Sequence, residues 1–340
     1  MNKPLYRTIL ISAWRTTWNH KRLWFWGLFV GLLGNAGEYQ FLVTALDRLS
    51  AGEIAPSATS GLGQGPPLNA QTMLGLANAF SANAFTTFVL LLISLIIIAV
   101  AAFFIWLVMV SVIALVKAGA VLAAGDEPPS LAEGVADGQR FFAPVLVLYV
   151  FGRLLLWFLF TILALFGLLA MKDFLVGFPM FMVAFILLLP ALFVVSFVVR
   201  YAIMYVVLKK RTLLEAFDSA VALVRENWLI TIELAFFLFV VNLVVGAALA
   251  LLVAGFVFPI HLAALTMGQL GLLGWAISLE FLAAVFFLLI LFSIGSALGT
   301  FQWLAWTMLF QRLQDKGPIS KIVRLLSRWT SNRSVRAARA

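Results

Sequence analysis

Charged side chains are scarce in this chain of 340 residues. Asp, Glu, Lys and Arg together make up 11% of it, whereas hydrophobic residues make up 64%. With a mean hydropathy of +1.09, this composition excludes an ordinary soluble globular protein. Among the charged residues, 14 are acidic and 23 are basic, which gives a formal net charge of +9. On so apolar a chain this excess indicates orientation in a membrane, and we expect no nucleic-acid partner. We predict an all-α, polytopic membrane protein.

Cysteine is absent, and the chain has only two histidines. The missing cysteines exclude disulfides, thiolate metal sites and cysteine nucleophiles. The histidines, His20 and His261, lie in segments that we expect on opposite sides of the bilayer, so they cannot share a metal ion. The phosphate-binding loop, the nucleophile elbow, the zinc-protease helix and the dinucleotide fingerprint are also missing from the sequence. We therefore predict a protein that is not an enzyme and has no metal and no cofactor.

A helix needs about 20 apolar residues to cross the hydrocarbon core of a bilayer. The predicted spans cover residues 22–46, 83–116, 143–171, 174–208, 228–260 and 280–310. The first is the least apolar, and an alternative is a signal peptide cleaved near Gly34-Asn35-Ala36. The last apolar run begins at Leu272 and, at ~1.5 Å per residue, is too long for one straight crossing. Its first part therefore lies at the interface, or the helix protrudes or bends near Gly295.

Basic residues are concentrated in alternate loops of this arrangement. If both termini lie in the cytoplasm, the outer segments contain only two basic residues, Arg48 and Lys172. Lys and Arg are retained on the cytoplasmic side during insertion. We therefore predict a multi-pass protein of the bacterial inner membrane with both termini in the cytoplasm. Residues 1–315 form one transmembrane domain, residues 47–82 a polar outer loop, and residues 316–340 a cytoplasmic tail.

Two segments 82 residues apart carry the same signal for the start of a helix. Ser130 precedes Glu133 by three residues, and Thr212 precedes Glu215 by the same spacing, which is the pattern of a capping box. Apolar residues then recur on one face, so we expect an amphipathic surface helix that turns into a span at Trp228. The N-terminal segment has the same character, which suggests three copies of a surface helix followed by a hairpin of spans. Alternatively, any amphipathic helix that precedes a span would look alike.

This unit resembles the membrane domain attached to some glycerophosphodiester phosphodiesterases and to related bacterial six-span proteins. The resemblance rests on three short motifs: Leu-x-Glu-Ala-Phe-x-x-Ala at 213–220, Val-Arg-Glu-Asn-Trp at 224–228, and Ala-Trp-x-x-x-Trp at 13–18. It implies a fold and a membrane location. It implies no catalysis, because the phosphodiesterase domain of such proteins is a separate soluble barrel that no segment here could supply.

The tail from residue 316 to 340 is basic and contains no acidic residue. Lys321, Arg324 and Arg328 alternate with apolar side chains, which is the pattern of a basic amphipathic helix on anionic lipid. We therefore expect anionic membrane lipids as partners. Contact of the tail with RNA or the ribosome is the alternative.

Glycines in the first and last spans have the spacing that allows helices to approach closely. Gly27 and Gly31 form one GxxxG pair, and Gly295 and Gly299 form another. Such pairs also arise by chance in apolar runs.

Charged residues inside the spans are the candidates for function, because a charge in the bilayer is costly. Arg153, Arg200 and Glu233 are expected at similar depths near the cytoplasmic side, whereas Glu280 is expected near the outer face. The first three could form a polar cavity open to the cytoplasm, in which the arginines bind a phosphate or carboxylate headgroup and Glu233 is their counter-ion. The alternative is that the side chains only snorkel to the interface or orient the spans.

These features favour a non-enzymatic membrane protein that organises the membrane or binds a lipid or a protein partner. The lipid site would be Arg153, Arg200 and Glu233, and the protein partner would bind the cytoplasmic helices. A transporter or lipid-translocating protein that uses the same cluster is the second hypothesis. An intramembrane enzyme is the third, because Glu233 and Glu280 are the only acid-base candidates in the spans and are expected at opposite depths.

Overall fold

The computed structural model describes residues 5–34, 84–172 and 174–315, and each element of secondary structure in these ranges is helical. The elements are α1 (Leu5–Asn19), η1 (Lys21–Leu23), α2 (Trp24–Gly34), α5 (Ala84–Ala124), α6 (Leu131–Lys172), α7 (Phe174–Lys209), α8 (Leu213–Leu252), the π-helical η2 (Val253–Val257), α9 (Phe258–Gln269) and α10 (Leu273–Asp315). The predicted outer loop at 47–82 and the tail with Lys321, Arg324 and Arg328 lie outside the described residues.

Five of the described helices are long and apolar enough to cross a membrane. This confirms the predicted class, an all-α multi-pass membrane protein. Helix α8 continues through η2 into α9, and together they form one of the five. The described part of the predicted first span is α2, and residues 35–46 of that span lie outside the described ranges.

The helices are longer than the predicted spans. Helix α5 continues eight residues past 116, to Ala124, and the α8–α9 helix continues past 260 to Gln269. Helix α6 is continuous from Leu131 to Lys172, whereas we predicted a surface helix followed by a separate span from residue 143. Pro144 lies inside α6, where it removes one backbone hydrogen bond without ending the helix. The last span is also one helix, α10, which at ~1.5 Å per residue is about 65 Å long.

Both predicted capping boxes are present. The backbone N–H of Ser130 donates to Glu133 Oε2 at 2.8 Å, and the N–H of Glu133 donates to Ser130 Oγ at 3.3 Å. At the start of α8, the N–H of Thr212 donates to Glu215 Oε2 at 3.2 Å, and the reciprocal half of the capping box is present as well. These bonds satisfy donors that a helix start leaves open.

Two of the predicted surface helices end or break directly before an apolar segment. Helix α1 ends at Asn19, and the chain passes through η1 into α2 at Trp24. Helix α8 is interrupted by the non-helical backbone of Asn227, with φ −124° and ψ 27°. The Asn227 amide donates to the Leu223 carbonyl at 3.2 Å, so the side chain satisfies an acceptor beside the break. The turn directly before Trp228 is therefore confirmed.

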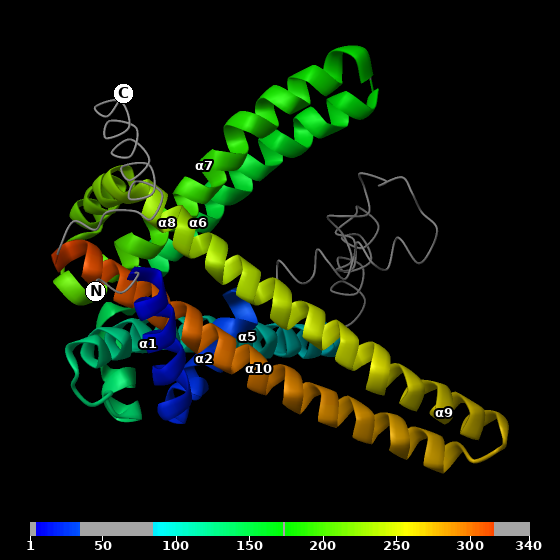
Figure 1. The fold of residues 1–340 in the computed structure, drawn as a ribbon. Coiled ribbons are helices and arrows are strands. Elements are labelled where there is room, and N and C mark those ends of the chain that lie inside the picture. Colours follow the sequence, from blue (N-terminus) through cyan, green and yellow to red (C-terminus); the bar gives the residue numbers. More distant parts are fainter. Residues whose placement is uncertain (1–4, 35–83, 173, 316–340) are drawn as a thin grey trace, which may run out of the picture.

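Two long hairpins diverge from a common packed region (Figure 1). The α6–α7 hairpin is drawn in green, and the α8–α10 hairpin, which consists of α8, η2, α9 and α10, runs from yellow to orange. The chain reverses between α9 and α10 at Gly271, whose φ of +79° suits glycine. Away from the packed region both hairpins expose large apolar side chains on most of their surface. In a bilayer such surfaces contact acyl chains.

The core lies at one end of the helices. Its main contributions are the buried residues within 108–118 of α5, 197–207 of α7 and 298–313 of α10. We call this end the basic end, because it carries Lys117, Lys209, Lys210, Arg211 and Arg312. Lys117 forms an ion pair with Asp137 of α6 there. The basic end is therefore where the fold gains its packing energy, and the hairpins extend from it.

Helices α2 and α10 approach closely through both GxxxG pairs. A Cβ atom at Gly27 would clash with Ser296 O and Thr300 Oγ1, and one at Gly299 would lie 2.7 Å from Gly27 O. A Cβ at Gly31 would lie 3.1 Å from Gly295 O. Thr300 also donates from its hydroxyl to the Leu23 carbonyl at 3.2 Å, which ties α10 to the start of α2. The glycines thus pack one helix directly onto the other.

We predict that Gly299→Ala destabilises the protein, whereas Gly295→Ala does not. The added methyl at 299 meets the backbone of α2 and should cost on the order of 1 to 3 kcal/mol of unfolding free energy. The methyl at Gly295 meets nothing within 4 Å, so only its gain in helix propensity of about 1 kcal/mol remains. Thermal unfolding of both variants in the same detergent measures the difference. Equal unfolding midpoints would contradict the glycine interface.

Candidate functional site

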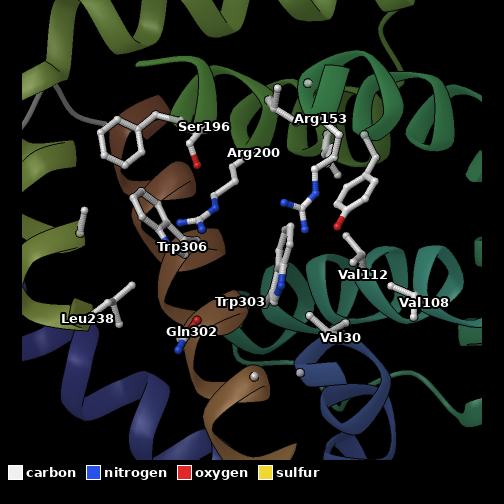
Figure 2. Close-up of a pocket in the computed structure, with 18 of the residues that line it drawn as sticks. Val30, Val108, Val112, Arg153, Ser196, Arg200, Leu238, Gln302, Trp303 and Trp306 are labelled. Carbon is white, nitrogen blue, oxygen red and sulfur yellow. The ribbon is translucent and has the colours of Figure 1, made fainter. Parts of the chain in front are cut away.

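A cavity of about 350 Å³ lies where the two hairpins meet α2 and α5 (Figure 2). Most of its wall is apolar or aromatic. The lining residues are Val30, Gly31, Val108, Met109, Val112, Val145, Tyr149, Gly152, Arg153, Leu156, Phe193, Ser196, Phe197, Val199, Arg200, Ile203, Ala235, Leu238, Phe239, Asn242, Gly299, Gln302, Trp303 and Trp306.

The structure brings Arg153 of α6 and Arg200 of α7 to this one cavity. Figure 2 shows both guanidinium groups reaching into the same space, with Trp303 and Trp306 of α10 beside them. The Arg200 guanidinium lies 5.1 Å from the centre of the Trp306 ring, and that of Arg153 lies 5.7 Å from the ring of Tyr149. The faces of aromatic rings attract cations, so these rings help to hold the guanidinium groups in the cavity.

Glu233, the third predicted member of the cluster, does not belong to the described lining of the cavity. Helix α8 lines the cavity with Ala235, Leu238, Phe239 and Asn242, which follow the helical spacing of one face. Glu233 is two residues before Ala235 and therefore lies on a different face of α8. Its side chain is half-buried, and its Oε2 atom is buried. Of the three predicted residues, the described lining of the cavity contains Arg153 and Arg200.

Asn242 of α8 and Gln302 of α10 also line the cavity with their side-chain amides. The sequence did not single them out as site residues. The Gln302 Nε2 donates to Asn242 Oδ1 at 2.7 Å, and both residues line the cavity. This bond uses one polar atom of each amide, so Asn242 Nδ2 and Gln302 Oε1 can face a ligand. Isolated amides within apolar runs were the only available signal in the sequence.

The cavity is closed toward the basic end by buried residues. Beyond Arg200, α7 is buried from Tyr201 to Val207. The Tyr201 hydroxyl forms a buried hydrogen bond of 3.0 Å with Thr231 Oγ1 of α8. Trp306 is 3% exposed, and its ring centre lies 6.0 Å from that of Tyr201, so it acts as a packing residue. We expected a cavity open toward the basic loops, and the structure shows packed side chains on that side.

The other predicted charges lie away from this cavity. Glu280 of α10 contacts His261 of α9, with 2.9 Å between Oε1 and Nδ1, near the far end of the α8–α10 hairpin. Both side chains are exposed. Among the residues that the structure describes, no group of three or more His, Asp or Glu side chains could hold a metal ion.

Comparisons of the chain with known protein families, curated proteins and solved structures found no match. The resemblance to the membrane domain of glycerophosphodiester phosphodiesterases therefore stays a prediction.

We predict that the Asn242 and Gln302 amides are energetically coupled. Replacing either by Leu removes the same hydrogen bond between α8 and α10, so each single variant should lose about 1 kcal/mol of unfolding free energy. The double variant should lose about 1 kcal/mol less unfolding free energy than the sum of the two single losses, because the hydrogen bond is lost only once. Unfolding of the four proteins in detergent measures this cycle. Strictly additive losses would contradict the bond.

Proposed function

We propose that this protein binds the headgroup of an anionic membrane lipid in the cavity between its hairpins, without catalysing a reaction on it. The observation that supports this most directly is that Arg153 and Arg200, from two different helices, line one largely apolar cavity. Arginine presents several N–H donors in a planar fork that matches the oxygens of phosphate and carboxylate. Two such forks around one small cavity suit a single anionic group.

The charge balance of the site supports an anionic ligand. No carboxylate belongs to the described lining of the cavity. Even if Glu233 compensates one arginine from its own face of α8, the cluster of Arg153, Arg200 and Glu233 keeps a formal charge of +1. An anion that binds beside this cluster would accept charge-assisted hydrogen bonds from the guanidinium groups.

The depth and the contacts of Arg200 argue against simple snorkelling of this side chain, whereas Arg153 is exposed and contacts Tyr149, one turn nearer the start of α6. Arg200 is nine residues before Lys209, so it lies about 13 Å along α7 from the basic end at ~1.5 Å per residue. A snorkelling side chain would extend toward that end. The Arg200 guanidinium instead lies against Trp306, a ring that is buried in the core and lines the cavity.

In the membrane, we propose that the basic end faces the cytoplasm and that the protein is in the bacterial inner membrane. The concentration of Lys and Arg at this end supports the orientation. The basic tail with Lys321, Arg324 and Arg328 would then contact anionic lipids of the same leaflet. Exposed apolar residues of the surface helices, such as Trp14 and Leu214, would contact the membrane or a protein partner.

Native mass spectrometry of the protein, released from nanodiscs that contain phosphatidylcholine and phosphatidylglycerol, tests this function. We expect one phosphatidylglycerol to remain bound to the wild type and to be lost from the Arg153→Gln, Arg200→Gln variant. Hydrogen bonds to a charged group contribute about 1.5 to 3 kcal/mol each, so loss of both should weaken binding on the order of 100-fold or more.

The matched control is Arg140→Gln, Arg312→Gln, which removes two exposed arginines that do not line the cavity. This variant should keep the bound lipid. Equal lipid retention in all three proteins would contradict the proposed site. Transfer of labelled lipid between leaflets of reconstituted vesicles, if it depends on Arg153 and Arg200, would make the protein a lipid-translocating one.

A further inference from the structure

We propose that the ligand reaches the two arginines sideways from the bilayer, through an opening between the α6–α7 hairpin and the α8–α10 hairpin. The ligand is then an anionic glycerophospholipid whose acyl chains stay in the membrane, and a water-soluble anion is excluded. This inference rests on the proposed function and adds the route and the source of the ligand.

The lining of the cavity shows where it opens. Phe193 of α7 and Phe239 of α8 line it and are 54% and 61% exposed. They belong to different hairpins, and each lies farther from the basic end than the buried core of its helix. We call Phe193 and Phe239 the mouth of the cavity. On the opposite side, Val145, Phe197 and Ile203 line the cavity and are buried.

The route from water at the basic end is blocked by packed and hydrogen-bonded side chains. Tyr201 and Thr231 are joined by a buried hydrogen bond between α7 and α8. One turn closer to the basic end, Tyr205 packs on Phe310 with ring centres 4.9 Å apart and accepts a hydrogen bond of 2.6 Å from Gln314. A hydrated phosphate would have to break these contacts to reach Arg200.

The route from the bilayer is open and apolar. The two hairpins diverge away from the packed region (Figure 1), and the mouth consists of one exposed lining residue from each hairpin. In the membrane the space between them contains acyl chains, because lipid-exposed surface at this depth has no water. A ligand that passes this space and binds beside the two arginines is expected to be apolar along its length and anionic at its head. An anionic glycerophospholipid has this chemistry.

Photo-crosslinking from the mouth tests the route. p-Benzoylphenylalanine, which reacts with nearby C–H bonds, would replace Phe239 in protein reconstituted into phosphatidylcholine nanodiscs with a minor fraction of phosphatidylglycerol. The matched control is the same replacement at Phe236, which is also 61% exposed and lies on α8 but does not line the cavity. Mass spectrometry of the adducts identifies the captured lipid.

At Phe239 we expect adducts enriched several-fold in phosphatidylglycerol over its share of the nanodisc, and loss of this enrichment in the Arg153→Gln, Arg200→Gln background. At Phe236 the adducts should follow the bulk composition in both backgrounds. Adducts that match the lipid composition of the nanodisc at both positions would overturn the lateral route. If arginine-dependent lipid binding still appears in native mass spectrometry, the proposed function stands and only the route is wrong.

Thiol labelling provides a second test, because the chain has no native cysteine. In liposomes, a charged, water-soluble thiol reagent should label Ser219→Cys, on the surface near Arg211, at least tenfold faster than Phe239→Cys. Inorganic phosphate in excess should leave the phosphatidylglycerol adduct at Phe239 unchanged. Equal labelling rates, or displacement of the lipid by phosphate, would overturn the inference.

Discussion

Apolar side chains in a bilayer gain little by leaving acyl chains for one another, so helix association depends on close fit and on hydrogen bonds. The structure meets this constraint at the basic end. Helices α2 and α10 touch backbone to backbone through Gly27 and Gly299, and Thr300 bonds across the same interface. Away from the basic end the two hairpins diverge (Figure 1). The placement of the cavity follows from where this packing ends.

The two arginines lie at that boundary. On the basic-end side of them, residues 201–207 of α7 are buried, and on the other side the hairpins expose large apolar side chains. Arg153 and Arg200 line the hollow between these zones. Their aromatic neighbours, Tyr149 and Trp306, hold the guanidinium groups there. An amphipathic ligand fits this boundary, because its headgroup meets charge and its chains meet lipid.

Local signals in the sequence predicted local structure well. The Ser130 and Thr212 capping boxes and the turn before Trp228 depend on side chains within a few residues of one another, and the structure contains all three. The prediction of a separate surface helix before the third span was wrong, because no break separates residues 131–140 from the rest of α6. A capping box specifies where a helix starts, and it carries no information on where that helix bends or stops.

The sequence by itself determined the class of the protein, the order of its apolar helices and which charged residues lie within them. These follow from composition and from spacing along one chain, which the bilayer converts directly into helices. Only the tertiary structure decided which of those charges share a site. It placed Arg153 with Arg200 and turned Glu233 to another face of α8, and it paired Asn242 with Gln302 across 60 residues. The rotation of one helix against another is set by packing between distant segments, and spacing along a single chain does not encode it.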